Sequence, residues 1–316
     1  MFQRIRQNKE ILYSLVLIVV PVAILFLITI FVKIRPISIE PAEIIPETVK
    51  PADIFGNVEI EARAAIVKDI NAGEILFGKN ENLPLALASL TKVLTALTFE
   101  VNAAEEIINI TYDDLKEEGN SLLYPGERFY KKDLIDFTLI TSSNDASAAL
   151  AANTLSGSTK ELSSPREAFV DEMNRLAKLI GMKSSNFSNE TGLDKSPTSA
   201  GAYGSASDIA TLFEYILKNY PEILEATGKS ITTIRSVNGI VHQATNTNEI
   251  IDKLPNAIAS KTGFTDIAGG NLAVVIDPGL NRPIIIVVLG STEEGRFADV
   301  EKLAQKTEEY LKLLSD

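Results

Sequence analysis

Ser89 and Lys92 place a hydroxyl and an amine three residues apart, in a stretch (Ala-Ser-Leu-Thr-Lys-Val-Leu-Thr-Ala-Leu) whose pattern predicts a helix. Residues at this spacing share a helix face, so the amine of Lys92 can reach the oxygen of Ser89. A serine hydroxyl is a weak nucleophile without a neighbouring base. A lysine in a dry site near other cations can lose its proton and act as that base. Taken alone, the match fits an exposed serine and lysine on an amphipathic helix better, because Ser-x-x-Lys is a common pattern.

Two later segments change this interpretation. Ser142-Ser143-Asn144 is predicted to lie at a junction between two helices, and Lys261-Thr262-Gly263 is predicted to end a strand over residues 257–261. Each triplet is short, and Ser-x-Asn also occurs at residues 184–186 and 236–238. The specific signal is the ordered set of Ser-x-x-Lys, Ser-x-Asn and Lys-Thr-Gly, which is typical of penicillin-recognising serine enzymes.

Composition excludes several other chemistries. The formal net charge of −12 argues against a nucleic-acid partner, which would need a basic surface. The chain has no cysteine, which excludes thiol catalysis, disulfides and cysteine metal sites. The single histidine, His242, argues against a histidine-based metal site. Composition therefore argues against metal sites built from cysteine or histidine.

Residues 11–32 carry no charge and predict a transmembrane helix. At about 1.5 Å per residue this run spans roughly 33 Å, enough to cross a bilayer core. The alternative, a cleaved signal peptide, would have a shorter apolar region of about 7–15 residues and a small-x-small cleavage site. Lys33-Ile-Arg-Pro follows instead. Basic residues are slightly more numerous before the span, so residues 1–10 are predicted as a cytoplasmic tail.

Residues 33–57 form a Pro/Glu-rich segment with a proline at every fifth position from Pro36 to Pro51. Proline fixes φ and interrupts regular hydrogen bonding, so this segment is predicted to be a stiff, extended stalk. A globular domain is expected over residues 58–316. The sequence thus predicts a single-pass protein of the cytoplasmic membrane, with its domain held on the extracytoplasmic side.

The order of the predicted elements indicates an α+β fold. A helical block begins near Ser89, and helical spacing of apolar residues continues through residues 166–182 and beyond Ser205. Strands are predicted on both sides of that block, and a final helix over residues 298–314; the strands are at residues 64–69, 74–77, 257–261, 270–276 and 283–289. This order predicts an antiparallel sheet built from both chain ends, with an inserted helical subdomain.

The residues around the motifs resemble a known family. Leu85-Ala-Leu-Ala-Ser-Leu-Thr-Lys is similar to the family's approach to its nucleophile, Phe187-Ser-Asn-Glu-Thr-Gly-Leu to its Phe-x-Asn-x-x-Gly-Leu segment, and Ser142-Ser-Asn-Asp-Ala to its Ser-Gly-Asn-Asp-Ala. From about Val58 onward the chain resembles the low-molecular-mass penicillin-binding proteins that act as serine D-alanyl-D-alanine carboxypeptidases. The resemblance implies a β-lactamase/transpeptidase-like fold, a peptidoglycan pentapeptide substrate ending in D-Ala-D-Ala, inhibition by β-lactams, and no cofactor.

The resemblance also implies a role for each catalytic residue. Ser89 would attack the carbonyl between the two terminal D-alanines and form an acyl-enzyme. Lys92 would take the proton of Ser89, and Ser142 with Lys261 would relay it to the departing amine. Asn144 would orient Lys92 or the peptide bond of the substrate.

Substrate binding is implied for the strand that follows Lys261. Thr262 and Lys261 would meet the terminal carboxylate, with Gly263 completing the motif. The backbone N–H groups of Ser89 and Phe264 would form the oxyanion hole. Some carboxypeptidases carry an arginine where this chain has Thr247, which leaves the carboxylate clamp incomplete.

Other functions stay open on the sequence alone. A Ser-His-Asp hydrolase would need His242 as its base, but the chain has no Gly-x-Ser-x-Gly elbow, so His242 is predicted to be structural. Class A β-lactamases use a glutamate to activate the deacylating water. Glu190 and Glu222 are available acids in this chain, but both lie outside the Glu-x-x-Leu-Asn context of that class. A D-alanyl endopeptidase or a β-lactamase-like hydrolase would use the same residues. An inactive scaffold that binds the cell wall is the remaining alternative.

Overall fold

The computed structural model describes residues 50–119, 122–154, 164–279 and 281–315. All of them belong to one compact unit, Thr48–Asp316. The predicted cytoplasmic tail, the predicted anchor at residues 11–32 and most of the predicted stalk lie outside the described residues. Within the described part of the chain, no helix has both the length and the apolar character needed to cross a membrane.

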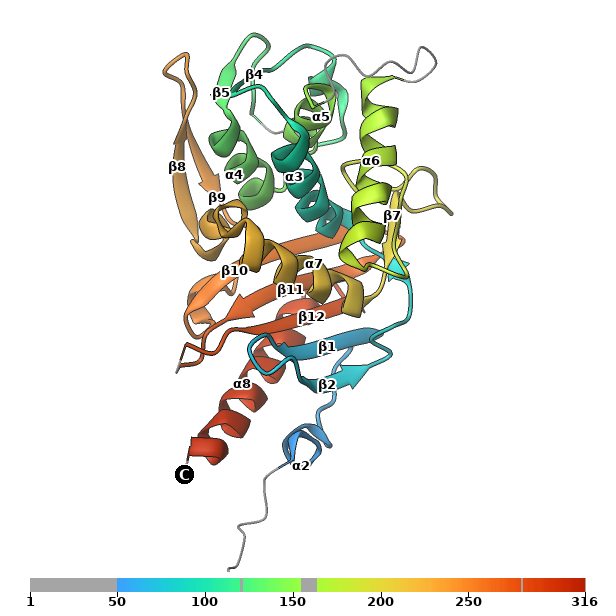
Figure 1. The fold of residues 1–316 in the computed structure, drawn as a ribbon, viewed down its shortest axis with the longest axis vertical. Coiled ribbons are helices and arrows are strands. Elements are labelled where there is room, and N and C mark those ends of the chain that lie inside the picture. Colours follow the sequence, from blue (N-terminus) through green and yellow to red (C-terminus); the bar gives the residue numbers. More distant parts are fainter. Residues whose placement is uncertain (1–49, 120–121, 155–163, 280, 316) are drawn as a thin grey trace, which may run out of the picture. The chain divides into compact units, whose positions relative to one another are not determined.

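Strands and helices follow in the predicted order (Figure 1). The strands are β1 (Ala64–Asp69), β2 (Ile75–Lys79), β3 (Leu85–Ala86), β4 (Ile107–Asn109), β5 (Arg128–Tyr130), β6 (Asn186–Phe187), β7 (Ala202–Gly204), β8 (Ile231–Arg235), β9 (Val241–Thr245), β10 (Ala257–Thr265), β11 (Gly269–Ile276) and β12 (Ile284–Ser291). The α-helices are α2 (Pro51–Phe55), α3 (Thr91–Asn102), α4 (Lys131–Thr141), α5 (Asn144–Ala152), α6 (Pro165–Ile180), α7 (Ala206–Asn219) and α8 (Gly295–Ser315).

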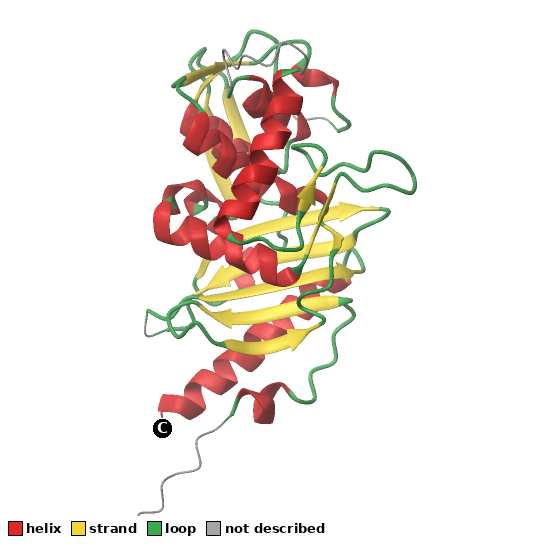
Figure 2. Cartoon of the chain, turned by 45° about the vertical axis from the view of Figure 1, so that its right-hand side comes forward, coloured by secondary structure: helices red, strands yellow, loops and turns green. Residues whose placement is uncertain are grey.

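The main sheet has five strands in the order β10-β11-β12-β1-β2, and every neighbouring pair is antiparallel. Strands from the two ends of the described unit meet where β1 pairs with β12. Helices α3 to α6 come from the intervening chain and lie beyond one face of the sheet (Figures 1 and 2). The prediction of an antiparallel sheet from both chain ends with an inserted helical region is confirmed.

Both faces of the sheet are covered. Side chains alternate between the faces of a strand, and in β12 Val287 belongs to the core shared with the helical region, whereas Val288 belongs to the core beneath α8. Helix α7 packs against β12 and β1 on the first face, and α8 packs against β12 and β11 on the second. This double burial explains why β12 is almost continuously apolar rather than alternating.

The central helices begin at capping residues. Ser164 and Glu167 form a reciprocal capping box at the start of α6, with Pro165 at the first helical position. At the start of α7, the side chain of Ser205 accepts a hydrogen bond from the backbone of Asp208, as that sequence pattern predicts. These caps fix where α6 and α7 begin, and α6 is one of the elements that surround the site.

Two boundaries differ from the predictions. Residues 51–55 were assigned to the stalk, but they form helix α2, and Phe55 is buried and stacks on Phe77 at 5.8 Å between ring centroids. Strand β10 does not end at Lys261 but continues to Thr265, because it pairs with β11 over that whole length. The Lys-Thr-Gly motif therefore lies inside a strand.

Candidate active site

Ser89 lies in a short 3₁₀ turn, Ala88–Leu90, which leads directly into α3. The predicted α-helix therefore begins two residues after the serine. The turn starts from Ala88, a non-glycine residue held at a φ of +48°, a conformation that costs free energy and persists only where surrounding structure enforces it. Lys92 lies in the first turn of α3, and its Nζ is 2.8 Å from Ser89 Oγ.

Lys92 is fully buried. Burial lowers its pKa from 10.5 to about 7, although the carboxylates of Glu190 and Glu117 act in the opposite direction. Its second contact is with the carbonyl of Thr191, at 2.7 Å. A neutral amine has two N–H groups and one lone pair, so it can donate to Thr191 while it accepts the proton of Ser89. The geometry and the lowered pKa together equip Lys92 to act as a base.

A second serine–lysine pair lies alongside. Lys261 Nζ is 2.8 Å from Ser142 Oγ and 2.9 Å from the carbonyl of Thr262. Ser142 ends α4 in the left-handed region, with a φ of +61°. Burial lowers the pKa of Lys261 well below its usual value, and the positive charges of Lys92 and Arg296 lower it further. Two buried amines with lowered pKa values therefore share one site.

Asn144 opens α5, next to Ser142. Its Nδ2 donates to the carbonyl of Glu118 at 2.6 Å, so this amide is anchored to the loop before α4. Its Oδ1 is buried, and within the described residues it has no hydrogen-bond partner. Because a buried acceptor without a partner is costly, Asn144 is better suited to receive the amide N–H of a bound peptide than to hold Lys92.

Strand β10 passes close to the nucleophile. A side chain on Gly263 would place its Cβ 2.9 Å from the carbonyl oxygen of Leu87 and 3.1 Å from the backbone nitrogen of Ser89, so only glycine lets the strand come this near. Thr262 Oγ1 lies 2.5 Å from Thr247 Oγ1. The next residue, Phe264, is 43% exposed. Lys-Thr-Gly thus forms one wall of the site.

Arg296 is a residue that the sequence did not single out. It lies in the first turn of α8, is buried, and donates from Nη1 to the carbonyl of Gly263 at 3.0 Å. Its Nε is one of the buried polar atoms in the described part of the chain that lack a partner. This arginine supplies positive charge at β10, whose Thr262 contacts Thr247, the residue that leaves the expected clamp incomplete. Only the three-dimensional fold brings α8 to this strand.

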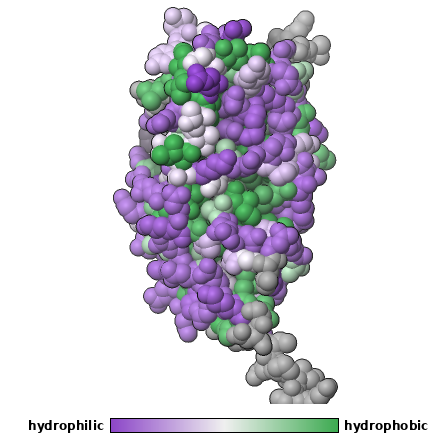
Figure 3. Space-filling view, turned by 90° about the vertical axis from the view of Figure 1, so that its left-hand side faces the viewer, coloured by the Kyte–Doolittle hydropathy of each residue, from purple (hydrophilic) through white to green (hydrophobic). Residues whose placement is uncertain are grey.

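A cleft of about 580 Å³ opens beside Ser142 and Asn144. Loop residues such as Tyr124 and residues of the β8–β9 hairpin such as Val241 line it. Figure 3 faces the side that carries this hairpin and shows hydrophobic residues scattered among hydrophilic ones. Ser142 and Asn144 line this cleft, whereas Ser89, Lys92 and Lys261 do not.

His242 takes a structural position, as predicted. Its Nε2 lies 2.6 Å from Glu127 Oε1, and its ring packs against both Phe129 and Phe137, at centroid distances of 5.6 and 5.5 Å. Its one side-chain hydrogen bond among the described residues is thus to a carboxylate and not to a serine. The described residues contain no group of three histidine or acidic side chains placed to hold a metal ion.

Gly192, in the Phe187–Asp194 segment, lies close to the backbone of Ala88, the residue before the nucleophile. Its φ is +80°, and a Cβ there would lie 2.0 Å from the carbonyl oxygen of Ala88. We expect Gly192→Ala to lower the free energy of unfolding by roughly 2–6 kcal/mol, from left-handed strain plus overpacking. Urea denaturation would measure this loss. Gly73→Ala is the matched control, because Gly73 also has positive φ but open space around it; equal losses in both variants would contradict the clash.

Comparison with known proteins places the chain in a family. The model of Peptidase_S11, D-alanyl-D-alanine carboxypeptidase, matches residues 47–293, which include every motif described above. The chain belongs to this family. It is 32% identical to the D-alanyl-D-alanine carboxypeptidase DacF of Bacillus subtilis over 250 residues, which are 77% of this chain and 61% of that relative. This chain thus spans about three fifths of the length of DacF.

Two further members of the comparison bear on activity. The chain is 30% identical to the D-alanyl-D-alanine endopeptidase of Pseudomonas aeruginosa, over 78% of this chain and 76% of that relative. Among solved structures, the ampicillin-bound form of penicillin-binding protein D2 from Listeria monocytogenes superposes with a TM-score of 0.64 and 27% identity, covering 79% of this chain and 98% of that one. The chain is therefore similar to proteins named for both peptidase activities and to a solved structure that holds a bound β-lactam.

Proposed function

We propose that the protein is a serine-type D-Ala-D-Ala carboxypeptidase, which removes the terminal D-alanine from peptidoglycan stem peptides through an acyl-enzyme on Ser89. The observation that carries this proposal is the buried contact of 2.8 Å between Ser89 and Lys92, whose pKa is lowered to about 7. Near neutral pH a large fraction of Lys92 is thus unprotonated while it touches the nucleophile. Family membership supplies the substrate class.

Acylation uses the two serine–lysine pairs in turn. Lys92 takes the proton of Ser89 as Oγ attacks the carbonyl carbon, and the negative charge on the carbonyl oxygen is met by backbone N–H groups of Ser89 and Phe264. Such donors contribute about 3–4 kcal/mol each in other acyl-transfer enzymes. The departing D-alanine needs a proton on its amine, and Lys261 with Ser142 relays to it the proton that Lys92 took from Ser89, which leaves Lys92 neutral again. Neutral Lys92 then takes a proton from the water molecule that attacks the acyl carbonyl, and it returns this proton to Ser89 Oγ as the acyl group leaves.

The terminal carboxylate of the substrate is recognised by β10 and its neighbours. Thr262 and Thr247 present adjacent hydroxyl groups at this strand. Behind it, Arg296 provides the positive charge that the family elsewhere obtains from an arginine at the position of Thr247. β-Lactams carry an equivalent carboxylate, so we infer that they acylate Ser89 in the same orientation.

Labelling with a fluorescent penicillin tests the nucleophile. We expect the intact protein to form a covalent adduct that survives denaturing electrophoresis, and Ser89→Ala to form none, because the attacking oxygen is missing. Ser143→Ala is a matched control, since Ser143 caps α5 by accepting from Ala146 and does not enter the chemistry. If the intact protein is not labelled, the nucleophile assignment is wrong and an inactive wall-binding scaffold becomes the better interpretation.

A D-alanyl endopeptidase is the second candidate, because one relative carries that name over a similar share of the chain. The chemistry at Ser89 is the same, and the two activities differ in what leaves with the amine. Incubation with a pentapeptide and, separately, with a cross-linked dimer distinguishes them by chromatography of the products. Release of D-alanine from the pentapeptide supports the carboxypeptidase; cleavage of the dimer alone would favour the endopeptidase.

We also propose that residues 11–32 anchor the protein in the cytoplasmic membrane, with the catalytic domain outside. This rests on the length and apolar character of that run and on the extracytoplasmic location of the proposed substrate. Carbonate washing of membranes should leave the full chain bound and should release a chain that begins at Thr48. Release of the full chain as well would contradict an anchor.

A further inference from the structure

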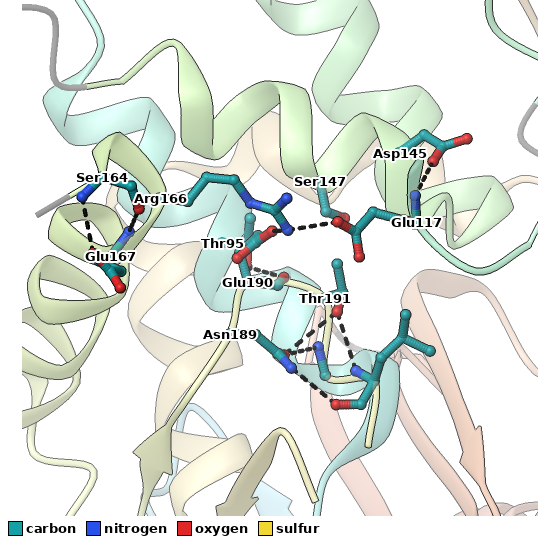
Figure 4. A network of polar contacts seen from close by, with 12 residues as sticks. Thr95, Glu117, Asp145, Ser147, Ser164, Arg166, Glu167, Asn189, Glu190 and Thr191 are labelled. Atoms are coloured by element: carbon teal, nitrogen blue, oxygen red, sulfur yellow. Dashed lines mark hydrogen bonds and ion pairs between the residues drawn. The ribbon is translucent and has the colours of Figure 1, made fainter. Parts of the chain in front are cut away.

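Three charged side chains from different elements, Arg166, Glu117 and Glu190, meet in one cluster (Figure 4). Arg166, on α6, contacts Glu117, from the loop after β4, at 2.7 Å, and it also contacts Glu190, from the segment between β6 and β7. Glu190 is 2% exposed, whereas Arg166 is 36% exposed. The arginine thus links two acidic side chains of segments that are more than 70 residues apart in the chain.

This ion cluster is continuous with the proposed base. Glu190 is followed by Thr191, whose carbonyl holds the amine of Lys92. The carbonyl of Glu190 itself accepts a hydrogen bond from Thr95, one turn further along α3, at 2.7 Å. The cluster therefore fixes both the position of the carbonyl acceptor and the charge that Lys92 experiences.

We propose that Arg166 is a positioning residue for acylation: by holding Glu117 and Glu190 together, it keeps the Thr191 carbonyl against Lys92 and limits the negative charge beside that amine. The inference rests on the proposed acylation of Ser89. It assigns a role in acylation to helix α6, which carries none of the three motifs.

The charges predict the direction of each effect. The groups that act on Lys92 are Glu190 and Glu117, which raise its pKa, Arg166, which neutralises part of their charge, and the neighbouring Lys261. Removing Glu117 takes away one negative charge, so the pKa of Lys92 should fall. Removing Arg166 leaves two carboxylates without their shared cation, so the pKa of Lys92 should rise at pH values above the raised pKa of Glu190.

The test is the rate of labelling by fluorescent penicillin as a function of pH, with full-length protein. In Glu117→Gln we expect the acidic limb of the profile to move down by about 0.5–1 pH unit, and in Arg166→Gln to move up by a similar amount. Arg166→Gln should also lower the maximal rate by about 10–100-fold, because the acceptor of Lys92 shifts. Arg166→Lys should return the acidic limb part of the way to its wild-type position, since lysine restores the positive charge but not the simultaneous contact with Glu117 and Glu190.

Arg175→Gln is the control, because it removes another arginine–glutamate pair from α6, one with an exposed arginine and no contact with the site. It should leave rate and profile unchanged. Opposite limb shifts in Glu117→Gln and Arg166→Gln support the proposal. A limb that stays in place in both, with any loss of rate following the loss of thermal stability, would show a merely structural cluster and overturn it. An unlabelled wild-type protein would instead contradict the proposed function itself, and this inference with it.

Discussion

Replacing Lys92 with methionine should lower the rate of Ser89 acylation by about 10²–10⁴-fold, the usual contribution of a positioned general base. Methionine keeps much of the length and volume of the lysine stem but cannot take a proton. The contact of 2.8 Å with Ser89 Oγ would be lost as an acid–base pair. Stopped-flow or time-resolved penicillin labelling measures the rate, and a loss below tenfold would exclude Lys92 as the base.

The pH profile makes the same prediction more specific. Lys92 acts as a base only when neutral, so the wild-type rate should rise as pH increases through about 7, the lowered pKa of this amine. Lys92→Met should retain no such limb. A surface substitution such as Lys178→Met should keep it, because that side chain is exposed on α6.

Lys92→Met should raise the stability of the folded protein, although it lowers the rate of acylation. The pKa of Lys92 falls from 10.5 in the unfolded chain to about 7 in the folded protein, so the unfolded chain binds more protons between these values and stability rises with pH across that window. At pH 7 the lowered pKa costs roughly 4 kcal/mol. Lys92→Met removes this cost, although it leaves the Thr191 carbonyl without its partner. We expect a higher Tm at pH 7 and a flatter dependence of Tm on pH from 7 to 10.

Replacing Lys261 with methionine is the second substitution with a large expected effect. Burial and the positive charges of Lys92 and Arg296 lower its pKa well below the usual value, which makes the loss of its proton easier. A substrate carboxylate at Thr262 would raise that pKa again, so Lys261 can take up the proton that Lys92 removed from Ser89 and pass it to the leaving amine through Ser142. Lys261→Met should therefore lower kcat by about 10²–10⁴-fold and also raise KM, because the charge that pairs with the carboxylate is absent.

Ser142→Ala separates these two roles of Lys261. It removes the hydroxyl of the relay at 2.8 Å but keeps the amine beside the carboxylate, so kcat should fall while KM stays near that of the wild type. Kinetics of D-alanine release from a pentapeptide measure both constants. Equal KM values for the wild type, Lys261→Met and Ser142→Ala would contradict a role for Lys261 in carboxylate recognition.

Much of the fold could be predicted because its signals are local. The buried strands β1, β11 and β12 are short apolar runs between turn residues, and the predicted ranges agree with them to within two residues. Helix α7 begins where its capping serine predicts. Strand β10 was predicted too short because Phe264 and Thr265 carry no apolar pattern, and their place in the strand is fixed by pairing with β11. Pairing between distant segments is a property of the fold and leaves little trace in local sequence.

The residues of the site also fall into two groups: those that local sequence motifs indicate and those that only the fold brings to the site. Ser89, Ser142 and Lys261 could be found because they lie in short motifs with defined spacing. Arg296 and Arg166 could not, because each acts through a backbone carbonyl or an ion pair that only the packing of α8 or α6 creates. A charged residue on an amphipathic helix looks the same in sequence whether it faces water or a buried carboxylate.

Helix α2 has a mechanical consequence under the proposal that residues 11–32 anchor the protein. It packs against the edge strand β2 and against α8, and Phe55 belongs to the core on the sheet face opposite the helical region. A pulling force on the chain before Pro51 would load this corner first. The turn that holds Ser89 belongs to the other core, with the sheet between them. In the proposed membrane-anchored enzyme, a pull on the anchor would therefore act first on the sheet face opposite the reactive serine.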